Sequence, residues 1–404
     1  MKKLLSLLLA LLLGLLPILS LAEGEEEGDE DLVIEEVVEE TIPPDVAPEN
    51  VYVDEDTGET FYLNEQEQQK LDGLIEAEPE EDLSVDPDSL DMNPNLPGNV
   101  INILLIGVDT RSDNPLEIVG RGDTEIIVSV NLDTGAIKMT SILRDSYVAI
   151  PGYRNKTKIN NAFQYGCNRV KSGEPLAKTK GGAALAMRTI NKNFEMNIQY
   201  YVAINFNGLA SIVDAIGGVH IDLTKGEAWY INKYLKDHPP AYDNKAKGER
   251  TPLEVRAGLQ HLDGVQAVMF ARTRSLKGEN DLNRTDRQRR LLDILLKYVL
   301  SNMDATMLMD LIGTATDYAA TNMNFETIWK LVTSLYPVLT KGMEEGTGDS
   351  AALFEQMRIP DKTETRSFKY DTKDGSSVLT YNVKKHTQAL HEFVYGSYIP
   401  AKAK

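Results

Sequence analysis

The chain has 404 residues, of which 42% are hydrophobic, so it can bury a large core, and its formal net charge is -20. It exceeds the usual single-domain size of about 100 to 250 residues, so appendages or a second domain are expected. The charge is uneven, because residues 23–100 carry a net -27 whereas residues 101–404 carry +5, which confines the acidity to a leader region and makes the body mildly basic.

Residues 1–22 combine two lysines, an apolar run from Leu4 to Leu21 and a small-residue end at Ala22. This pattern is typical of a segment that directs export. The run is close to the shortest stretch that crosses a bilayer, about 17 residues. A retained signal anchor and a signal peptide cleaved after Ala22 therefore both stay open. In either case the rest of the chain is expected on the extracytoplasmic side, attached to the membrane or secreted.

Residues 23–99 are acidic, contain several prolines and hold few apolar groups. Like charges repel one another, and too little apolar surface is available to offset the entropy of the chain. We expect a disordered acidic spacer over this range.

The composition changes at Val100. The apolar run NVINILLIGVD predicts a strand buried on both faces that ends near Asp109. Two further strands, 124–132 and 136–143, flank a predicted turn at 133–135. Strands that alternate with helices favour a covered α/β sheet. The elements predicted next are a helix over 181–194, a strand over 200–206, a helix that ends at 217–218 and a strand over 219–223.

The C-terminal third is predicted to be richer in helices. Residues 224–257 are polar and Lys-rich, which indicates an excursion from the core. The next segment fits a helix or a strand by periodicity, with Asp263 as a suitable N-cap. Residues 100–404 are therefore expected to form one large domain, with a mixed central sheet covered by helices on both faces. Its last predicted elements are an amphipathic helix over 284–302, helices near 306–320 and 325–339, a hairpin turning near 374–375 and a helix over 383–394.

Several kinds of catalytic site are excluded. The chain has no G-x-S-x-G elbow, no P-loop and no H-E-x-x-H motif. Five scattered histidines and the single Cys167 argue against a zinc site, a Cys-His nucleophile or an internal disulfide.

Two carboxylates and several arginines stand out instead. Asp109 follows one predicted strand and Asp123 precedes the next, with Arg111, Arg121 and Arg144 beside them. Ligand sites of α/β sheets favour such strand ends. Either acid alone would be explained by a turn or a loop. Acids mixed with arginines suit a magnesium ion that binds a phosphate.

A second group of arginines lies between residues 271 and 290. Arg284 and Arg287 are three apart in a helical pattern and so face the same way, and Arg272 and Arg274 precede them across a short loop. Guanidinium groups bind phosphate oxygens bidentately, so a diphosphate is a suitable ligand. A solvated basic helix is the alternative. Nucleic acid is not an expected partner of an exported chain with so acidic a leader.

Taken in order along the chain, these motifs resemble the LytR-CpsA-Psr family of bacterial cell-envelope proteins. The matching segments run collinearly from Asn102 to Arg290 and include NILLIGVDTR, GRGDTEIIVSVN, TSILRDSYVAIPGY, KINNAFQYG and NDLNRTDRQRR. The resemblance implies a membrane-attached extracytoplasmic transferase. Such an enzyme moves a glycopolymer, such as teichoic acid or capsule, from a polyprenyl-diphosphate carrier to peptidoglycan through a phosphodiester.

The resemblance also implies roles for individual residues. Asp109 and Asp123 would hold magnesium, with manganese as a substitute. Because the acceptor hydroxyl must also lose its proton, an unligated oxygen of Asp109 or Asp123 is the available general base. The residues implied around the diphosphate are Arg121, Arg144, Arg272, Arg274, Arg284 and Arg287, with Arg111 and Gln288 close by. Two alternatives stay open: a non-catalytic polyprenyl-phosphate-binding scaffold or sensor, and a lipid pyrophosphatase that uses water as the acceptor.

Overall fold

The computed structural model describes most of the chain between residues 84 and 401, together with two short strands before it. Three of the predicted site residues, Arg111, Arg274 and Arg284, lie outside the described residues, as does the N-terminal apolar run. The described residues are 51–53, 60–62, 84–110, 116–237, 240, 250–273, 287–288, 290–291, 294–295, 318–324, 327, 330–331, 354–363, 366–373 and 376–401.

A six-stranded mixed sheet forms the centre of the fold, in the order β11-β8-β3-β4-β5-β12. The long apolar strand β3 lies in the middle, where it pairs antiparallel with β4 and parallel with β8. At one edge β12 runs parallel to β5. The carboxyl ends of β3, β5, β8 and β12 therefore meet at the same edge of the sheet. The strands are β3 (Val100–Val108), β4 (Gly122–Asn131), β5 (Ile137–Ile142), β8 (Tyr200–Asn205), β11 (Ala319–Thr321) and β12 (Phe354–Ile359).

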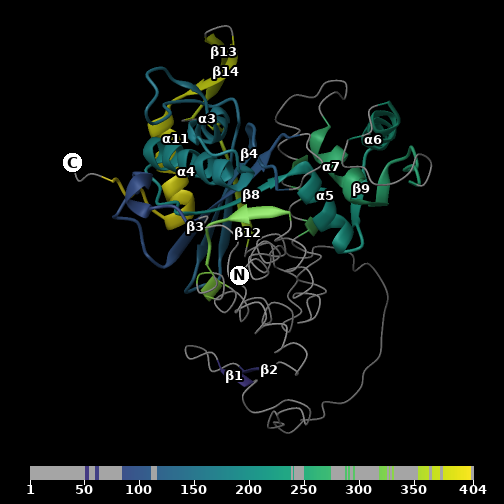
Figure 1. Cartoon of the computed structure of the whole chain (residues 1–404), viewed down its shortest axis with the longest axis horizontal. Helices are drawn as coiled ribbons and strands as arrows, with labels where there is room; N and C mark the ends of the chain where they lie inside the picture. Colours follow the sequence, from purple (N-terminus) through teal and green to yellow (C-terminus); the bar gives the residue numbers. More distant parts are fainter. Residues whose placement is uncertain are drawn as a thin grey trace.

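Helices cover both faces of this sheet, as Figure 1 shows. One face carries α3 (Asn161–Arg169), α4 (Pro175–Phe194) and α11 (Val383–Tyr395). The other carries α5 (Phe206–Ala215), α6 (Lys225–Asp237) and α7 (Gly264–Arg272). This arrangement confirms the predicted α/β class with a mixed sheet. The smaller elements are η2 (Pro87–Leu90) and the hairpins β1–β2 (Val51–Val53, Thr60–Tyr62), β6–β7 (Tyr147–Val148, Thr157–Lys158), β9–β10 (Val219–Leu223, Gly258–Leu262) and β13–β14 (Phe368–Lys373, Ser376–Tyr381).

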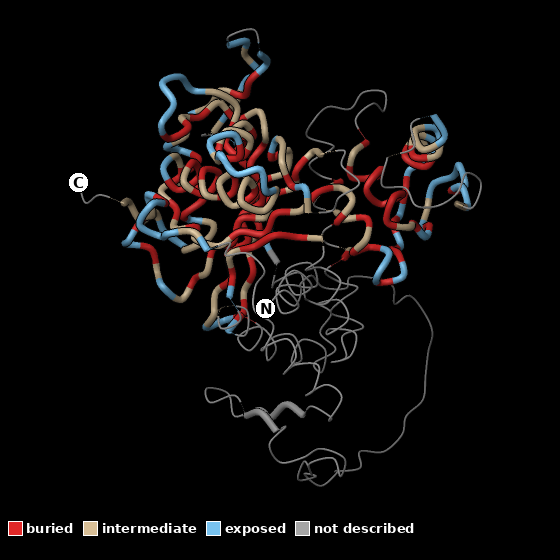
Figure 2. Tube along the Cα trace, in the orientation of Figure 1, coloured by how far each residue is buried: buried red, intermediate tan, exposed pale blue. Residues whose placement is uncertain are grey.

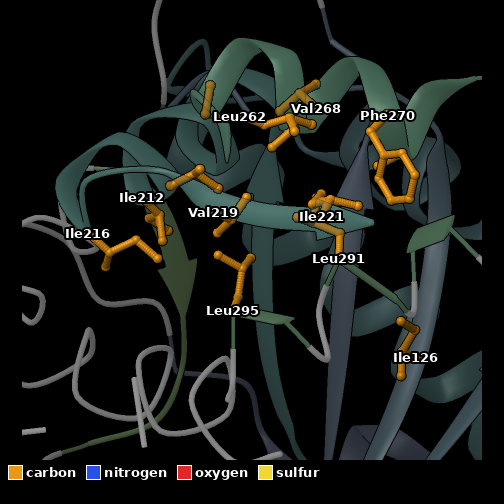
Figure 3. Packing of buried hydrophobic residues seen from close by; sticks show 14 of the residues in the cluster. Ile126, Ile212, Ile216, Val219, Ile221, Leu262, Val268, Phe270, Leu291 and Leu295 are labelled. Atoms are coloured by element: carbon orange, nitrogen blue, oxygen red, sulfur yellow. The ribbon is translucent and has the colours of Figure 1, made fainter. Parts of the chain in front are cut away.

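The apolar core has one layer on each side of the sheet. Successive residues of a strand point to opposite faces, so Ile126 belongs to one layer and Ile127 to the other. Buried residues continue through both helical layers (Figure 2). Leu291 and Leu295, four residues apart, are fully packed against the layer that contains Ile126 (Figure 3). Their spacing agrees with the predicted amphipathic helix in that region.

Some elements differ from the sequence-based expectation. Helix α3 and strand β12 were not predicted, and Ala319 and Ala320 form part of a strand rather than the end of a helix over 306–320. The residues from Lys225 form helix α6, which belongs to the core because Ala228 and Ile231 are buried in it. A capping box starts this helix: the Glu227 amide donates to the Thr224 hydroxyl (3.2 Å), and the Thr224 amide donates to Glu227 Oε2 (2.8 Å).

The folded domain begins before Val100, within the range predicted to be a spacer. Leu90 and Leu96 are buried, and the buried Asn93 side chain donates to the Glu195 and Ile399 carbonyls at 3.0 and 2.9 Å. Residues 84–99 therefore belong to the folded domain, because they bury apolar and hydrogen-bonded groups against it. The hairpin β1–β2 also lies within the range expected to be disordered. Residues 1–50 lie outside the described part. Within the described part, no helix is both long and apolar enough to span a bilayer.

Candidate functional site

The two predicted carboxylates meet where β3 ends and β4 begins. The antiparallel register pairs Gly107 with Thr124 and Val108 with Gly122, which leaves Asp123 as an extra residue in a bulge. Bulges of this kind redirect a side chain and are frequent beside active sites. The backbone amides of Asp109 and Asp123 both donate to the Arg121 carbonyl, at 3.2 and 3.0 Å. The bulge therefore ties the two acidic residues to one point of the backbone.

A polar pocket of about 530 Å³ opens at this edge. Four of the predicted residues line it together: Asp109, Arg121, Asp123 and Arg144. The structure therefore brings these four residues together in one pocket, as predicted. Its remaining lining residues, which sequence reasoning did not select, are Gly120, Asp145, Lys158, Asn160 and Gln164.

Neighbouring side chains fix the Asp123 carboxylate. Arg144 Nη1 donates to Asp123 Oδ2 at 2.8 Å, and Asn160 Nδ2 donates to Oδ1 at 3.0 Å. Across the pocket, Arg121 Nε donates to Gln164 Oε1 at 3.4 Å. These bonds hold an acid and two arginines in place before any ligand arrives.

A lysine-aspartate pair completes the wall. Lys158 Nζ lies 2.6 Å from Asp145 Oδ1, and the Asp145 carboxylate is also 3.9 Å from Arg144 Nε. Asp145 therefore shares its charge between two cations of the pocket. Asp145 follows Arg144 directly, and Lys158 and Asn160 fall in the matched segment KINNAFQYG. Asp145 falls in the matched segment TSILRDSYVAIPGY, so for all three residues the family resemblance was the signal that could have identified them.

Glu125 lies beneath the pocket as a buried acid. Burial, and then the negative charge of Asp123, raise the pKa of Glu125 to about 8. Both of its carboxylate oxygens are buried, and neither has a hydrogen-bond partner among the described residues. At pH 7 the carboxyl is therefore mainly protonated and adds little charge to the site.

An apolar cavity of about 110 Å³ lies on the opposite side of β4. Thr124 lines this cavity, whereas its chain neighbour Asp123 lines the polar pocket. Arg272 and Gln288 contribute polar groups to it, and the Arg272 guanidinium lies 4.3 Å from the centre of the Phe206 ring. The other lining residues are Leu105, Ile106, Gly107, Ile126, Val202, Ile204, Asn205, Phe206, Leu209, Ala271, Leu291 and Leu295.

Arg287 occupies a different position from the other described arginines. Its Nε donates to Glu227 Oε1 at 2.6 Å and its Nη1 donates to the Thr273 carbonyl at 3.3 Å. Both partners of the ion pair are buried, with 7% and 5% of their side chains exposed. Arg287 is not among the residues that line either cavity. Its direct contact with a diphosphate therefore stays a prediction.

The pocket has a donor set that suits magnesium. Magnesium takes one or two protein carboxylates and completes its shell with phosphate oxygens and water. Asp109 and Asp123 supply the carboxylates, and the buried Asn160 Oδ1 has no hydrogen-bond partner among the described residues. Within the described part of the chain, no three His, Cys, Asp or Glu side chains gather as a metal site. The set therefore fits an ion that shares its ligands with a phosphate.

Comparison with known proteins places these features in context. The teichoic acid transferase TagU of Enterococcus faecalis is 28% identical over 268 residues, 66% of this chain and 76% of that protein. The TagU protein of Oceanobacillus iheyensis is 30% identical over 236 residues, 58% of this chain and 63% of that protein. Biofilm regulatory protein A of Streptococcus mutans is 31% identical over 201 residues, 50% of this chain and 44% of that protein.

Solved structures share the fold. A Streptococcus agalactiae protein superposes with a TM-score of 0.55 at 23% identity, covering 76% of this chain and 90% of that one. Bacillus subtilis TagV superposes with a TM-score of 0.50 at 22% identity, and the match covers 76% of this chain and 100% of the TagV chain. The LytR_cpsA_psr family matches residues 60–374, well over half of the chain. The protein therefore belongs to the LytR-CpsA-Psr family.

Proposed function

We propose that this protein transfers a glycopolymer from a polyprenyl-diphosphate carrier to peptidoglycan in the bacterial cell envelope, with magnesium as the cofactor. One observation carries the proposal: a polar pocket with two carboxylates and two arginines lies across a single strand from an apolar cavity. A lipid diphosphate has the same division into an apolar tail and an anionic head. The names of the TagU relatives support the substrate class.

The chain's own residues position and neutralise the diphosphate. Arg121 and Arg144 are oriented by Gln164 and Asp123, so their guanidinium groups are available to phosphate oxygens with little reorganisation. Arg272, stacked on Phe206, lies where the apolar cavity meets polar groups. When bound by Asp109 and Asp123, magnesium would neutralise negative charge on the diphosphate. Phosphoryl transfer depends mainly on such positioning and charge stabilisation.

The proposed reaction exchanges one phosphorus-oxygen bond for another. A hydroxyl oxygen of peptidoglycan attacks the phosphorus that bears the glycan, and the bond from that phosphorus to the lipid phosphate breaks. The products are a glycan-peptidoglycan phosphodiester and a polyprenyl monophosphate. The hydroxyl proton passes to a carboxylate oxygen of Asp109 or Asp123. Asp123 already accepts bonds from Arg144 and Asn160, which favours Asp109 as the base.

The N-terminal segment fits this role. If residues 1–22 are retained, they would hold the domain beside the membrane where the lipid carrier lies. Lys2 and Lys3 favour a cytoplasmic end for that segment.

The test uses the purified full-length chain in detergent, a polyprenyl-diphosphate disaccharide labelled in the sugar, peptidoglycan and magnesium. We expect polyprenyl monophosphate and labelled peptidoglycan in equal amounts, with both products abolished by EDTA and by Asp123→Asn. Asp222→Asn, an exposed acid on β9 outside both cavities, is the matched control. Monophosphate without labelled peptidoglycan would indicate a pyrophosphatase, and binding without any product would indicate a scaffold. Either result would refute the transfer.

A further inference from the structure

A basic segment includes two residues of the polar pocket wall, Lys158 and Gln164. Residues 152–180 contain seven Lys or Arg and only one acid, Glu174, for a net charge of +6. This exceeds the +5 of the whole stretch 101–404. Segment 152–180 is therefore a local concentration of positive charge. Arg154, Lys156, Arg169 and Lys171 are exposed there.

Aromatic rings give this surface a fixed shape. The Tyr153 and Tyr165 rings stack with centroids 4.5 Å apart, and the Arg169 guanidinium lies 4.5 Å from the Tyr153 centroid. Arg169 Nη2 also donates to the Pro151 carbonyl at 3.3 Å. At Gly152 the backbone φ is +79°, a left-handed conformation that favours glycine, and an added Cβ would lie 2.7 Å from Arg169 Nη2.

The stack adjoins the pocket through helix α3. Tyr165 follows Gln164, which lines the pocket and accepts the hydrogen bond from Arg121. Lys158, also in the pocket wall, closes the loop that carries Arg154 and Lys156. The basic surface is therefore joined to the pocket wall through the chain neighbours Lys158 and Gln164, and the apolar cavity lies across β4 from that pocket.

We propose that this surface binds the anionic glycan chain that the lipid diphosphate carries. We name it the basic ledge and define it as Tyr153, Arg154, Lys156, Tyr165, Arg169 and Lys171. The inference rests on the proposed function, because the order of cavity, pocket and ledge matches the order of lipid, diphosphate and polymer in the donor. A polymer with a phosphate in each repeat complements the clustered positive charge. The tyrosine faces offer flat contact area for sugar rings.

The ledge should act on polymer binding and not on chemistry. The test variant is Arg154→Glu/Lys156→Glu/Lys171→Glu, which leaves the Arg169-Tyr153-Tyr165 stack and the pocket lining intact. The matched control is Lys225→Glu/Lys236→Glu/Lys384→Glu, three exposed lysines on α6 and α11 with the same change in charge. Thermal unfolding checks that both variants are folded.

Two donor substrates distinguish an effect of the ledge from an effect of the pocket. One is a polyprenyl-diphosphate disaccharide, and the other is the same lipid carrying a poly(glycerol phosphate) chain. A surface ion pair contributes roughly a factor of two to three. The ledge variant should therefore raise KM for the polymer donor about tenfold or more at low salt. Its kcat, and its KM for the disaccharide donor, should match those of the wild type. Added salt should shrink the difference, because exposed charges are screened.

A direct binding measurement tests the ledge even if the protein transfers no polymer. Soluble poly(glycerol phosphate) should bind the wild-type full chain and the control variant, and binding to the ledge variant should fall about tenfold. Equal binding by all three proteins would overturn the inference. An unchanged KM for the polymer donor, or equal losses with both donors, would overturn it too. A change confined to the KM for peptidoglycan, or to binding of phosphatidylglycerol vesicles, would assign the ledge to the acceptor or the membrane instead.

Discussion

Replacing Arg287 with methionine removes one partner of a buried ion pair and tests what this arginine does. Glu227 Oε1 accepts from Arg287 Nε at 2.6 Å, and Oε2 accepts from the Thr224 amide and hydroxyl at 2.8 and 3.0 Å. Burial alone would raise the pKa of Glu227, but the Thr224 and Arg287 donors together lower it below its usual value. The ionised carboxylate thus depends on Arg287 as well as on the start of helix α6.

The expected cost follows from the burial of the pair. With 7% and 5% of the two side chains exposed, solvent cannot replace the missing partner. Breaking a buried pair on one side typically costs about 3 to 5 kcal/mol. This is a large part of the roughly 5 to 15 kcal/mol by which a domain is stable. Glu227→Gln/Arg287→Met removes both charges and should return to within about 2 kcal/mol of the wild type.

Urea unfolding at pH 7 measures both effects. A lowered pKa gives stability that is present above the usual glutamate value of 4.5 and lost as the pH falls through the folded value. The difference in free energy of unfolding between wild type and Arg287→Met should therefore become smaller at acidic pH. A single-variant loss below about 1 kcal/mol would refute this reasoning, because buried charges without partners cost more than that. A double variant that is stable but does not bind lipid diphosphate would assign Arg287 to the substrate.

Three further predictions follow from single contacts. The pKa of Glu125 is about 8 in the folded protein, against an ordinary value of 4.5. The free energy of unfolding of the metal-free protein should therefore fall as the pH rises between these values, by up to about 1.4 kcal/mol per pH unit. Glu125→Gln should remove this pH dependence in urea unfolding, and an unchanged pH dependence would contradict the prediction. Gly264→Ala should lower the free energy of unfolding by about 1 to 3 kcal/mol, because the new Cβ would lie 1.9 Å from the Ala210 carbonyl oxygen where α5 contacts α7. Gly98→Ala is the near-neutral control, because a Cβ added there would have no atom within 4 Å. Phe206→Leu removes the ring under Arg272 and should weaken polyprenyl-diphosphate binding about two- to fivefold, corresponding to about 0.5 to 1 kcal/mol; a calorimetric titration with unchanged affinity would exclude the stack.

The parts of the site predicted from sequence are those set by strand ends. Asp109 and Asp123 flank two strands whose apolar pattern is strong, so their meeting at one edge followed from the sheet. Arg121 and Arg144 were predicted for the same reason. Asp263 is likewise an N-cap visible in the sequence, and it forms a capping box with Gln266 at the start of α7.

The missed residues reach the site through long-range contacts. Asn160 is placed by the bond from the Gly122 amide to its carbonyl (3.2 Å) and by the bond from its own amide to the Arg144 carbonyl (3.4 Å). No periodic pattern in the loop before it indicates these bonds. Helix α3 was missed because glycine is a poor helix former. Yet a Cβ at Gly166 would lie 2.2 Å from the Gly181 carbonyl, so glycine allows α3 and α4 to touch.

The role of Arg287 shows a second limit of sequence reasoning. Helical spacing predicts that Arg284 and Arg287 lie on one side of a helix. It does not show that Glu227, 60 residues earlier, folds back to Arg287 and buries its charge. Tertiary pairing of this kind depends on how α6 packs on the core.

The central claim is that the polar pocket holds a metal-bound diphosphate whose lipid enters the apolar cavity. A crystal structure of the protein with a polyprenyl diphosphate and manganese, which gives an anomalous signal, tests it most directly. We predict a manganese peak between Asp109 and Asp123, phosphate oxygens at Arg121 and Arg144, and prenyl density against Phe206 and Leu209. A diphosphate bound elsewhere, or a pocket with no metal at Asp123, would contradict the account.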